Sequence, residues 1–384
     1  MDQQLIMLPG PTNVPQRVMR AMIKPIVNHR GPEFHEMYPK LLEKVKKVLQ
    51  TENDVFVLTS SGTGGVEAAM SNIVKPGDKV IVPVAGEFGA RLAETVEVYG
   101  GEAIRIEVEP GDAPTAKQVE EVFERERNVK ALAVVYNETS TGTTVRELRE
   151  MGEIAKKYGA LFIVDAISIL GGDDLLVDKW NVDVCIAASQ KCLAAPPGVA
   201  IISLSEDAWK AVRRGRPASF YFDLSRYKKY LEEKRETPYT PALPLFFALD
   251  EALTMILEYG LERWIARHKI AARAFYSAFQ AIGLKLFAKK RARSNVVIAV
   301  CGPEKISVGA FREHLRRKYS VVVAGGFGKL KDLIFRVGCM GAITAREVVT
   351  TIASIENALA DLGVQVPLGK GIEAAWTHLR ELRE

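Results

Sequence analysis

Cysteine and metal-binding histidine patterns are scarce in this sequence. Four cysteines occur among 384 residues, and none forms a C-x-x-C pair. Three of them lie in or beside strongly apolar runs, so we interpret them as buried free thiols and expect no disulfide framework. The five histidines show neither H-x-x-x-H nor H-E-x-x-H spacing, which argues against a histidine-rich zinc site. We therefore expect no metal and a reducing compartment, by default the cytoplasm.

Long apolar runs and an excess of one charge are also missing. No apolar run reaches the ~18 residues that a membrane span needs, and residues 1–4 lack the basic and apolar parts of a signal peptide. Lysine and arginine number 52 and aspartate and glutamate 47, a net charge of only +5. The densest basic runs, 213–214 and 289–291, have no aromatic ladder beside them, which favours a solvated surface over a nucleic-acid groove. We expect neither a membrane nor a nucleic-acid partner.

What the sequence does contain is enough apolar material for a large core. Hydrophobic residues make up 48% of the chain, and its length allows two or three domains of about 150 residues. Between residues 54 and 204, short β-branched runs alternate with amphipathic stretches, which predicts a mostly parallel sheet covered by helices on both faces. The expected strands are 55–58, 80–82, 104–108, 131–135, 161–164, 182–187 and 199–202. The helices expected between several of them are 66–74, 91–99, 117–125 and 147–158.

The remainder of the chain predicts a second, smaller α/β domain. A looser segment covers about 213–244, and one long helical stretch covers 245–282. Strand, helix, strand, strand and helix patterns then follow between 295 and 362. We expect a large domain of about 16–265 and a small domain built from 1–15 and 266–384.

A glycine-rich turn, TSSGTGG at 59–65, joins a predicted strand to a helix expected to begin near Val66. Small residues and the N–H groups of a helix N-terminus can bind phosphate, and Ser61 and Thr63 add hydroxyl donors. The turn matches neither a P-loop nor the dinucleotide fingerprint. A plain strand-to-helix turn is the alternative interpretation.

Asp165 ends the apolar run 160–164. In a parallel sheet the carboxyl ends of strands face the ligand crevice, where a carboxylate needs a partner such as a protonated ring nitrogen. A helix N-cap or a surface ion pair is the alternative.

Lys191 follows the predicted strand 182–187 and precedes the small-residue turn 194–198. A lysine held in a crevice there can have the lowered pKa that Schiff-base chemistry requires. An ordinary solvated lysine is the alternative.

Arg336 lies inside the apolar run 333–337. Its planar guanidinium suits bidentate capture of a carboxylate, and the alternative is an exposed position on an edge strand. Together with the turn, Asp165 and Lys191, it supplies the four functions that pyridoxal 5'-phosphate (PLP) requires: a phosphate cup, a pyridinium partner, an imine lysine and a substrate-carboxylate clamp.

These features carry a family resemblance. The motifs LPGPTNVP at 8–15, VDAISILGG at 164–172 and SQKCLAAPPG at 189–198, with Arg336-Val337-Gly338, resemble the serine–pyruvate and alanine–glyoxylate aminotransferases, which are class V, fold-type I PLP enzymes. The resemblance spans nearly the whole chain. It implies a large PLP-binding α/β domain, a smaller C-terminal α/β domain and a homodimer with shared active sites.

The resemblance also implies roles for individual residues. Lys191 would bind PLP covalently and shuttle the proton, Asp165 would pair with the pyridine nitrogen, and Arg336 would bind the substrate α-carboxylate. The other cofactor-binding residues implied are Ser61, Gly62, Thr63, Phe88, Thr139, Ile167, Gln190 and, from the partner subunit, Thr240. Many members have Trp where Phe88 stands and Ser where Thr139 stands. A tyrosine common in the family is replaced by Thr237, which leaves Tyr239 as its substitute.

The implied activity is ping-pong transfer of an amino group from serine or alanine to pyruvate or glyoxylate. Another class V PLP enzyme, either a cysteine desulfurase-like lyase or an aspartate-type aminotransferase, is an alternative. Desulfurases usually carry histidine immediately before the lysine and on the ring, where this chain has Gln190 and Phe88. A non-catalytic nucleotide-binding module is the alternative of another class. The roles of His29 and Arg30 stay open, since Arg30 could serve a second substrate carboxylate.

Overall fold

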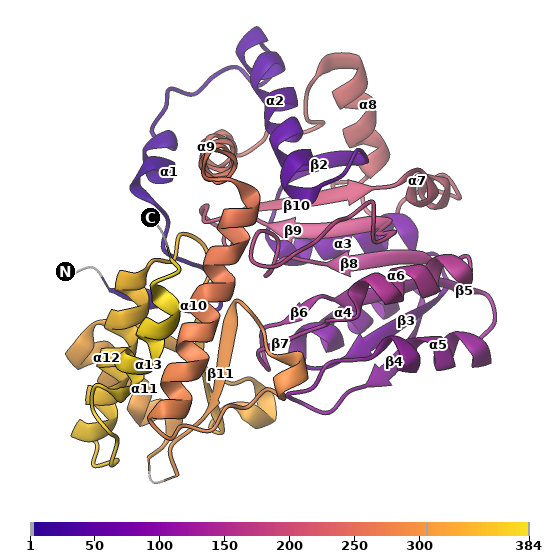
Figure 1. Cartoon of the computed structure of the whole chain (residues 1–384). Helices are drawn as coiled ribbons and strands as arrows, with labels where there is room; N and C mark the ends of the chain where they lie inside the picture. The colour runs from indigo at the N-terminus through magenta and orange to yellow at the C-terminus, as the bar shows by residue number, and fades with distance from the viewer. Residues whose placement is uncertain (1–3, 305, 383–384) are drawn as a thin grey trace.

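Seven strands form the larger sheet of the computed structural model, which describes residues 4–304 and 306–382 (Figure 1). In spatial order they are β2 (Asp54–Thr59), β10 (Val199–Leu204), β9 (Val184–Ala188), β8 (Leu161–Asp165), β5 (Val129–Val135), β3 (Lys79–Val84) and β4 (Glu102–Glu107). Only β10 runs antiparallel to its neighbours in this sheet. The expectation of a mostly parallel α/β sheet is therefore confirmed.

Alternating side chains explain why this sheet is covered on both faces. In β2, Val55 and Val57 pack into one core cluster, whereas Phe56 and Leu58 pack into the other. Successive side chains of a strand point to opposite faces, so a strand that is apolar throughout needs a helical layer on each side. Helices α2 (Pro32–Leu49), α5 (Ala116–Arg125), α6 (Leu148–Lys157) and α9 (Leu243–Tyr259) contribute to the first cluster. Helices α3 (Gly62–Ile73), α4 (Glu87–Val98), α7 (Glu206–Val212) and α8 (Leu224–Lys234) contribute to the second.

A smaller, four-stranded sheet lies beside the first. Its strands are, in order, β1 (Leu5–Met7), β12 (Val321–Gly325), β13 (Ile334–Gly338) and β11 (Val297–Cys301). Strand β1 is parallel to β12, and β13 is antiparallel to both of its neighbours. The helices in this part are α10 (Leu261–Ala281), α11 (Val308–Tyr319), α12 (Ala345–Asp361) and α13 (Lys370–Leu379). The remaining short elements are α1 (Gln16–Ala21), the strands β6 (Asn137–Glu138) and β7 (Thr143–Thr144), and the 3-10 turns Lys290–Ala292 and Gly328–Leu330.

Several expected elements differ from the structure, among them the helix expected over 91–99, which is α4 and begins at Glu87. Helix α3 begins at Gly62 rather than near Val66, because the Ser61 hydroxyl accepts a hydrogen bond from the backbone of Gly64 and caps the helix there. The helix expected over 245–282 is two helices, α9 and α10, because Gly260 between them has a φ of +93°, outside the helical region. The segment expected to be loose, 213–244, contains α8.

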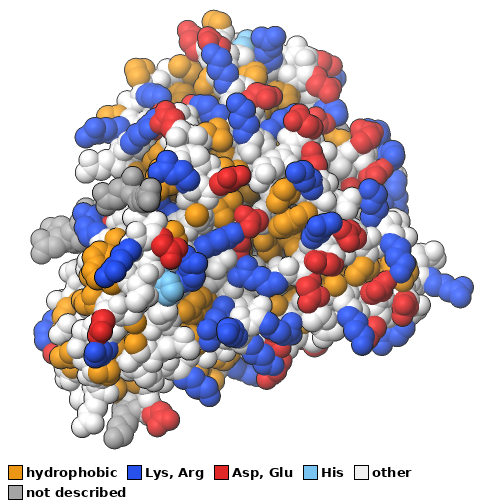
Figure 2. All heavy atoms as spheres, viewed as in Figure 1, with side chains coloured by type: hydrophobic (Ala, Val, Ile, Leu, Met, Phe, Trp, Pro, Cys, Tyr) orange, Lys and Arg blue, Asp and Glu red, His pale blue; other side chains and the backbone are white. Residues whose placement is uncertain are grey.

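The surface is mixed in charge. Figure 2 shows basic and acidic side chains interspersed across the visible face. The two basic runs are paired with carboxylates: Arg214 with Asp78, and both Lys289 and Arg291 with Asp112. The basic residues of both runs are exposed. Within the described residues, no helix combines the length and apolar character that crossing a bilayer requires.

Candidate active site

A cavity lies at the carboxyl ends of the parallel strands. Strand β8 ends at Asp165, and β9 ends three residues before Lys191, so both side chains reach the same edge of the sheet. The cavity is lined by Ser61, Gly62, Thr63, Val66, Phe88, Arg91, Leu92, Thr95, Val135, Asn137, Thr139, Asp165, Ile167, Ser168, Gln190 and Lys191. The structure thus brings together nine of the eleven residues expected from the sequence. The two that do not line the cavity are Thr240 and Arg336.

Lys191 is held in place from the N-terminal segment of the chain. Its Nζ donates a hydrogen bond to the carbonyl oxygen of Pro9. A Cβ atom on Gly10 would lie 2.4 Å from Lys191 Cδ, and Gly10 has a φ of +97°, so the close approach of this segment requires glycine. Burial lowers the pKa of Lys191 to about 8. Lys191 is therefore not an ordinary solvated lysine.

Asp165 is a buried carboxyl group, 8% exposed, at the floor of the cavity. Its Oδ1 accepts a hydrogen bond of 2.9 Å from the backbone N–H of Ile167. No helix follows it directly, and among the described residues it forms no ion pair, so the structure supports neither alternative, cap nor surface pair. Burial raises the pKa of Asp165 to about 7. A buried acid in this condition is stabilised by a cationic partner.

The N-terminus of α3 closes one end of the cavity. Ser61 is the N-cap, and Gly62 and Thr63 are the first two helical residues. Within the described chain the N–H groups of these two residues have no acceptor, as expected for the first turn of a helix. A Cβ atom on Gly62 would lie 2.9 Å from the Ile167 side chain, so glycine at this position lets the start of α3 pack against Ile167. These donors and the helix dipole suit an anion.

The chemistry of these residues fits PLP. Besides the unpaired Asp165 and the free N–H groups of α3, the side-chain oxygen of Gln190 is buried without a hydrogen-bond partner. A cofactor with a phosphate and a protonated ring nitrogen supplies partners for the helix end and for Asp165. A buried polar atom without a partner costs about 1–3 kcal/mol, so the Gln190 oxygen also favours a ligand in this cavity.

Phe88 forms a side wall, and a buried acid supports it. Glu138 is 3% exposed, and its Oε2 accepts hydrogen bonds from the backbone N–H groups of Phe88 (3.0 Å) and Gly89 (2.9 Å). Its Oε1 accepts the N–H of Ser140 at 3.1 Å and also the Ser140 hydroxyl. Burial raises the pKa of Glu138. The sequence analysis assigned Glu138 no role, although it immediately precedes Thr139, which lines the cavity.

Arg336 lies beside the cavity, bonded to the backbone of the lining residue Thr139. It is 5% exposed and lies in β13, which has a strand on each side, so the edge-strand alternative is wrong. Its Nε donates to the carbonyl oxygen of Gly325 at 2.7 Å and its Nη1 to that of Thr139 at 2.8 Å. Burial lowers the pKa of Arg336 to about 10, which leaves it charged at neutral pH. Among the described residues it has no carboxylate partner.

Thr240 lies outside the cavity and is exposed. Its neighbour Ala242 donates its N–H to the Thr59 hydroxyl at 3.0 Å, so this segment passes beside the end of β2. The Tyr239 hydroxyl donates a hydrogen bond to the carbonyl oxygen of Phe220 at 2.8 Å. Arg30 is held by the Glu236 carboxylate.

Four polar residues that line the cavity were missed from the sequence: Arg91, Thr95, Asn137 and Ser168. Asn137 donates to the Ser168 hydroxyl at 2.9 Å, and its Oδ1 accepts hydrogen bonds from Ser294 and Thr144. Their positions in the sequence were the available signal: Asn137 stands two residues after the end of β5, and Ser168 belongs to the motif that contains Asp165. Ser294 precedes β11 of the smaller sheet, so Asn137 joins the cavity to that part of the chain.

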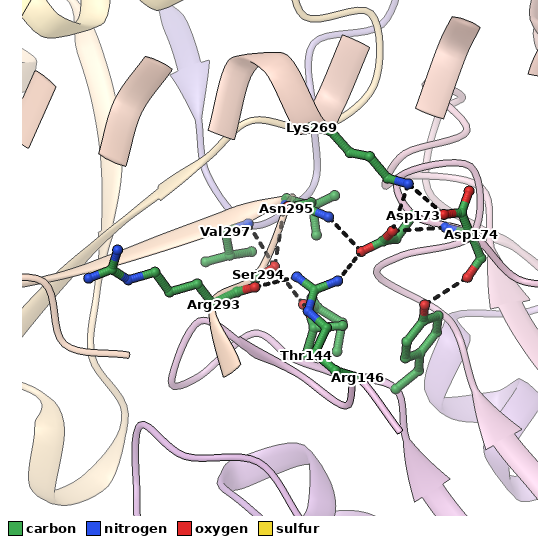
Figure 3. A network of polar contacts seen from close by, with 12 residues as sticks. Thr144, Arg146, Asp173, Asp174, Lys269, Arg293, Ser294, Asn295 and Val297 are labelled. Atoms are coloured by element: carbon green, nitrogen blue, oxygen red, sulfur yellow. Dashed lines mark hydrogen bonds and ion pairs between the residues drawn. The ribbon is translucent and has the colours of Figure 1, made fainter. Parts of the chain in front are cut away.

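Asp173 is the centre of the polar junction between the two sheets (Figure 3). It is 4% exposed and accepts hydrogen bonds from Arg146 Nη1 at 2.6 Å and Asn295 Nδ2 at 2.7 Å. Lys269 of α10 approaches the same carboxylate at 3.4 Å. Asp173 is buried while Arg146 and Lys269 are partly exposed, so the junction connects a buried carboxylate to cations at the surface. We infer that this junction fixes the orientation of the smaller sheet relative to the cavity.

Comparisons with known proteins agree on the family. The family described as Aminotransferase class-V matches residues 6–328. An uncharacterized aminotransferase of Methanocaldococcus jannaschii is 47% identical over 97% of both chains. A serine–glyoxylate aminotransferase of Methylorubrum extorquens is 36% identical over 98% of this chain and 96% of its own. An L-aspartate–glyoxylate aminotransferase of Paracoccus denitrificans is 34% identical over 99% and 97%. The crystal structure of ureidoglycine–glyoxylate aminotransferase from Bacillus subtilis superposes with a TM-score of 0.95 at 32% identity and 99% coverage of both chains.

Proposed function

The chain belongs to the class V aminotransferases, which are PLP-dependent enzymes, and on this basis we propose that it transfers the amino group of serine or alanine to glyoxylate or pyruvate. The observation that carries the proposal is the ion pairing of three arginines: Arg91, which lines the cavity, Arg30 and Arg336. Arg91 is paired with Glu87 and Arg30 with Glu236, whereas Arg336 has no carboxylate partner among the described residues. Of these three guanidinium groups, the one without a carboxylate suits a substrate with one carboxylate.

The names of the relatives support glyoxylate as the acceptor, but they name different amino-group donors. The relatives from Methylorubrum and Paracoccus both take glyoxylate by name, one from serine and one from aspartate. A second substrate carboxylate that used Arg91 or Arg30 would have to compete with Glu87 or Glu236. Burying an unpaired charge costs several kcal/mol, so small neutral donors are favoured over aspartate and glutamate.

We propose that the N-terminus of α3, Gln190 and Asp165 bind PLP. The chemistry that bound PLP supplies is withdrawal of electrons from the donor's α-carbon and carriage of the amino group between two half-reactions. Ser61, Gly62 and Thr63 hold the phosphate with N–H and hydroxyl donors, and Gln190 adds its side chain. Asp165 keeps the ring nitrogen protonated, since an ionised carboxylate in a buried site strongly favours a cationic neighbour.

The remaining contacts shape the cofactor's surroundings. Phe88 and Ile167 line the cavity from different elements, so we assign them the apolar contacts to the ring. We assign the Thr139 hydroxyl to the cofactor's phenolic oxygen. The carbonyl oxygen of Thr139 accepts a hydrogen bond from Arg336 Nη1.

Lys191 is the base in this proposal. Its amine first holds the cofactor and, once freed, takes the proton from the donor's α-carbon and later returns a proton. A pKa of about 8 leaves an appreciable neutral fraction near neutral pH, which a general base requires. Arg336 orients the donor by its carboxylate so that the α-hydrogen faces Lys191.

We further propose a homodimer in which Thr240 reaches the phosphate of the partner subunit. Its exposure outside its own cavity supports this assignment, as does the apolar surface nearby. Ile23 and Ile26 are exposed large apolar side chains in the segment just before Arg30, which holds the carbonyl oxygens of Thr237 and Pro238. Exposed apolar surface of this kind marks interaction sites.

Other finer points stay proposals. We propose residues 16–265 as the PLP-binding domain and 1–15 with 266–384 as the small domain. The four cysteines are free thiols, which supports a reducing compartment such as the cytoplasm.

Membership of the aminotransferases sets aside the nucleotide-binding module. No cysteine is among the residues lining the cavity, which disfavours a desulfurase.

The test is a donor and acceptor screen with purified, PLP-loaded enzyme. The expected result is a higher kcat/KM for serine or alanine than for aspartate or glutamate, with glyoxylate or pyruvate preferred over 2-oxoglutarate. A dicarboxylic donor as the best substrate would contradict the proposal. Arg91→Ala and Arg30→Ala would then show which second arginine serves the extra carboxylate.

A further inference from the structure

Phe327 lies in the connection between β12 and β13, outside both strands and immediately before the 3-10 turn Gly328–Leu330. We propose that Phe327 positions Arg336 for the substrate carboxylate and limits the size of the donor's side chain. This inference rests on the proposed function, because it concerns the substrate of that same site.

The ring of Phe327 contacts two parts of the site at once. The guanidinium carbon of Arg336 lies 4.7 Å from its centroid, a cation–π geometry. The ring also meets that of Phe88 edge to face, with centroids 6.1 Å apart and an interplanar angle of 89°. Phe88 lines the cavity, so Phe327 bridges the cavity wall and the carboxylate-binding arginine.

Core packing does not account for this side chain. Phe327 is 37% exposed and belongs to none of the buried clusters. Its loop is nevertheless well defined, because the N–H of Leu330 donates to the Phe327 carbonyl oxygen at 2.8 Å. A Cβ atom on Gly326 would lie 2.0 Å from the Leu330 carbonyl oxygen, so this turn requires glycine next to Phe327. An aromatic side chain presented by a constrained turn is placed for contact with a ligand.

The contacts of Arg336 indicate what the ring does. Nε donates a hydrogen bond to the carbonyl oxygen of Gly325, and Nη1 donates one to that of Thr139. Nη2 has no acceptor among the described residues and is left for a carboxylate. The ring covers one face of the guanidinium, so a carboxylate must approach in the guanidinium plane, the favoured geometry for its N–H donors. A carboxylate bound there lies beside the ring, and the donor's side chain must share the remaining space with Phe327 and Phe88. Serine and alanine fit this limit better than leucine or phenylalanine.

The test compares Phe327→Ala and Phe327→Leu with Leu333→Ala. Leu333 is a matched control, since it is a large apolar side chain in the same connection, is 60% exposed and cannot form a cation–π contact. The first readout is binding of propionate, a monocarboxylate that lacks an amino group, to PLP-loaded enzyme by calorimetry. Loss of a cation–π contact between a buried guanidinium and a partly exposed ring predicts an increase in Kd of about fivefold in Phe327→Ala. Phe327→Leu, which keeps apolar bulk but no π face, should bind propionate nearly as weakly.

The second readout is the kinetics of donors. In Phe327→Ala, the KM for alanine should rise with kcat nearly unchanged, and the ratio of kcat/KM for leucine to that for alanine should increase. Leu333→Ala should behave as wild type in all measurements. Unchanged propionate affinity and donor ratio in both Phe327 variants would overturn the inference while leaving the proposed function intact. If wild type rejects serine and alanine, the proposed function fails, and propionate binding still decides the positioning role of Phe327.

Discussion

The carboxylate of Glu138 accepts the backbone N–H of Phe88 over 3.0 Å, so a buried acid fixes the residue that walls the cavity. Because Phe88 is the second residue of α4, the same carboxylate also compensates the positive end of that helix. One residue after Glu138, the backbone of Thr139 holds Arg336. A single short loop therefore sets the positions of both the cofactor wall and the substrate clamp.

Glu138→Gln should lower both stability and PLP affinity. A glutamine oxygen can accept on only one side, and its amide N–H groups would face either the donors of Phe88 and Gly89 or that of Ser140. We expect a loss of about 1–3 kcal/mol in apoprotein stability and an increase in the Kd for PLP of roughly tenfold. Thermal melts and a spectroscopic PLP titration measure the two effects. Glu94→Gln, at an exposed position on α4, is the control and should change neither.

Lys191→Ala should abolish transamination, a fall in kcat of ~1000-fold or more, because a general base and the covalent attachment are lost together. In wild type, borohydride reduction followed by peptide mapping should place PLP on Lys191. Lys130, whose pKa is also lowered by burial, is the comparison, and Lys130→Ala should retain activity. Labelling of a lysine other than Lys191 would refute the assignment.

Asp165→Asn should stabilise the apoprotein at high pH. The folded pKa of about 7 lies above the ordinary value of 3.8, so between these values the folded state binds more protons than the unfolded state. Stability therefore falls as pH rises through this range, and the variant, which has no such proton to lose, escapes the fall. At pH 8 the variant apoprotein should be more stable by ~2 kcal/mol or more, because each pH unit of separation contributes about 1.4 kcal/mol. At pH 4 the two should be similar.

The same variant should be slow when loaded with PLP, since a neutral amide does not hold the ring nitrogen protonated. Melts between pH 4 and 8, with and without PLP, together with single-turnover rates, test both expectations. Asp207→Asn, at an exposed acid, should leave the pH dependence of melting unchanged. Near-normal turnover in Asp165→Asn would identify Asp165 as a structural residue.

Mixing Thr240→Ala subunits with Lys191→Ala subunits should restore activity. If Thr240 acts on the partner's phosphate, each mixed dimer has one site with both lesions and one intact site. Thr240→Ala alone should weaken PLP binding by about tenfold, the effect of losing a hydrogen bond to a charged group. Verified mixed dimers without recovered activity would show that Thr240 serves its own subunit or none.

Local patterns predicted most of the larger sheet and much of the cavity. Most strands of that sheet are apolar enough to be identified by themselves, and Asp165 and Lys191 stand at or just after strand ends that the parallel arrangement brings together. Boundaries were predicted less well where one residue decides them, as Ser61 does for the start of α3 and Gly260 for the break between α9 and α10. Local periodicity carries no information about such caps and breaks.

Contacts between distant segments were beyond sequence reasoning. The hydrogen bond from Lys191 to the Pro9 carbonyl oxygen joins residues 182 positions apart, and the one from Arg336 to Thr139 joins residues 197 positions apart. Neither leaves a local pattern, because backbone carbonyl acceptors are the same at every residue. The support that Glu138 gives to Phe88 was missed for the same reason.

The pairing of β1 with β12 has a consequence for how the chain folds during synthesis. Leu5 pairs with Val321, so the first strand has no sheet partner until most of the chain has left the ribosome. The larger sheet is complete at residue 204 and can form earlier. Pro9, which contacts Lys191, directly follows this late-paired strand. Closing so long a loop is entropically costly and slow, so the nascent chain acquires its cofactor-binding sheet well before the N-terminal segment can dock against the lysine.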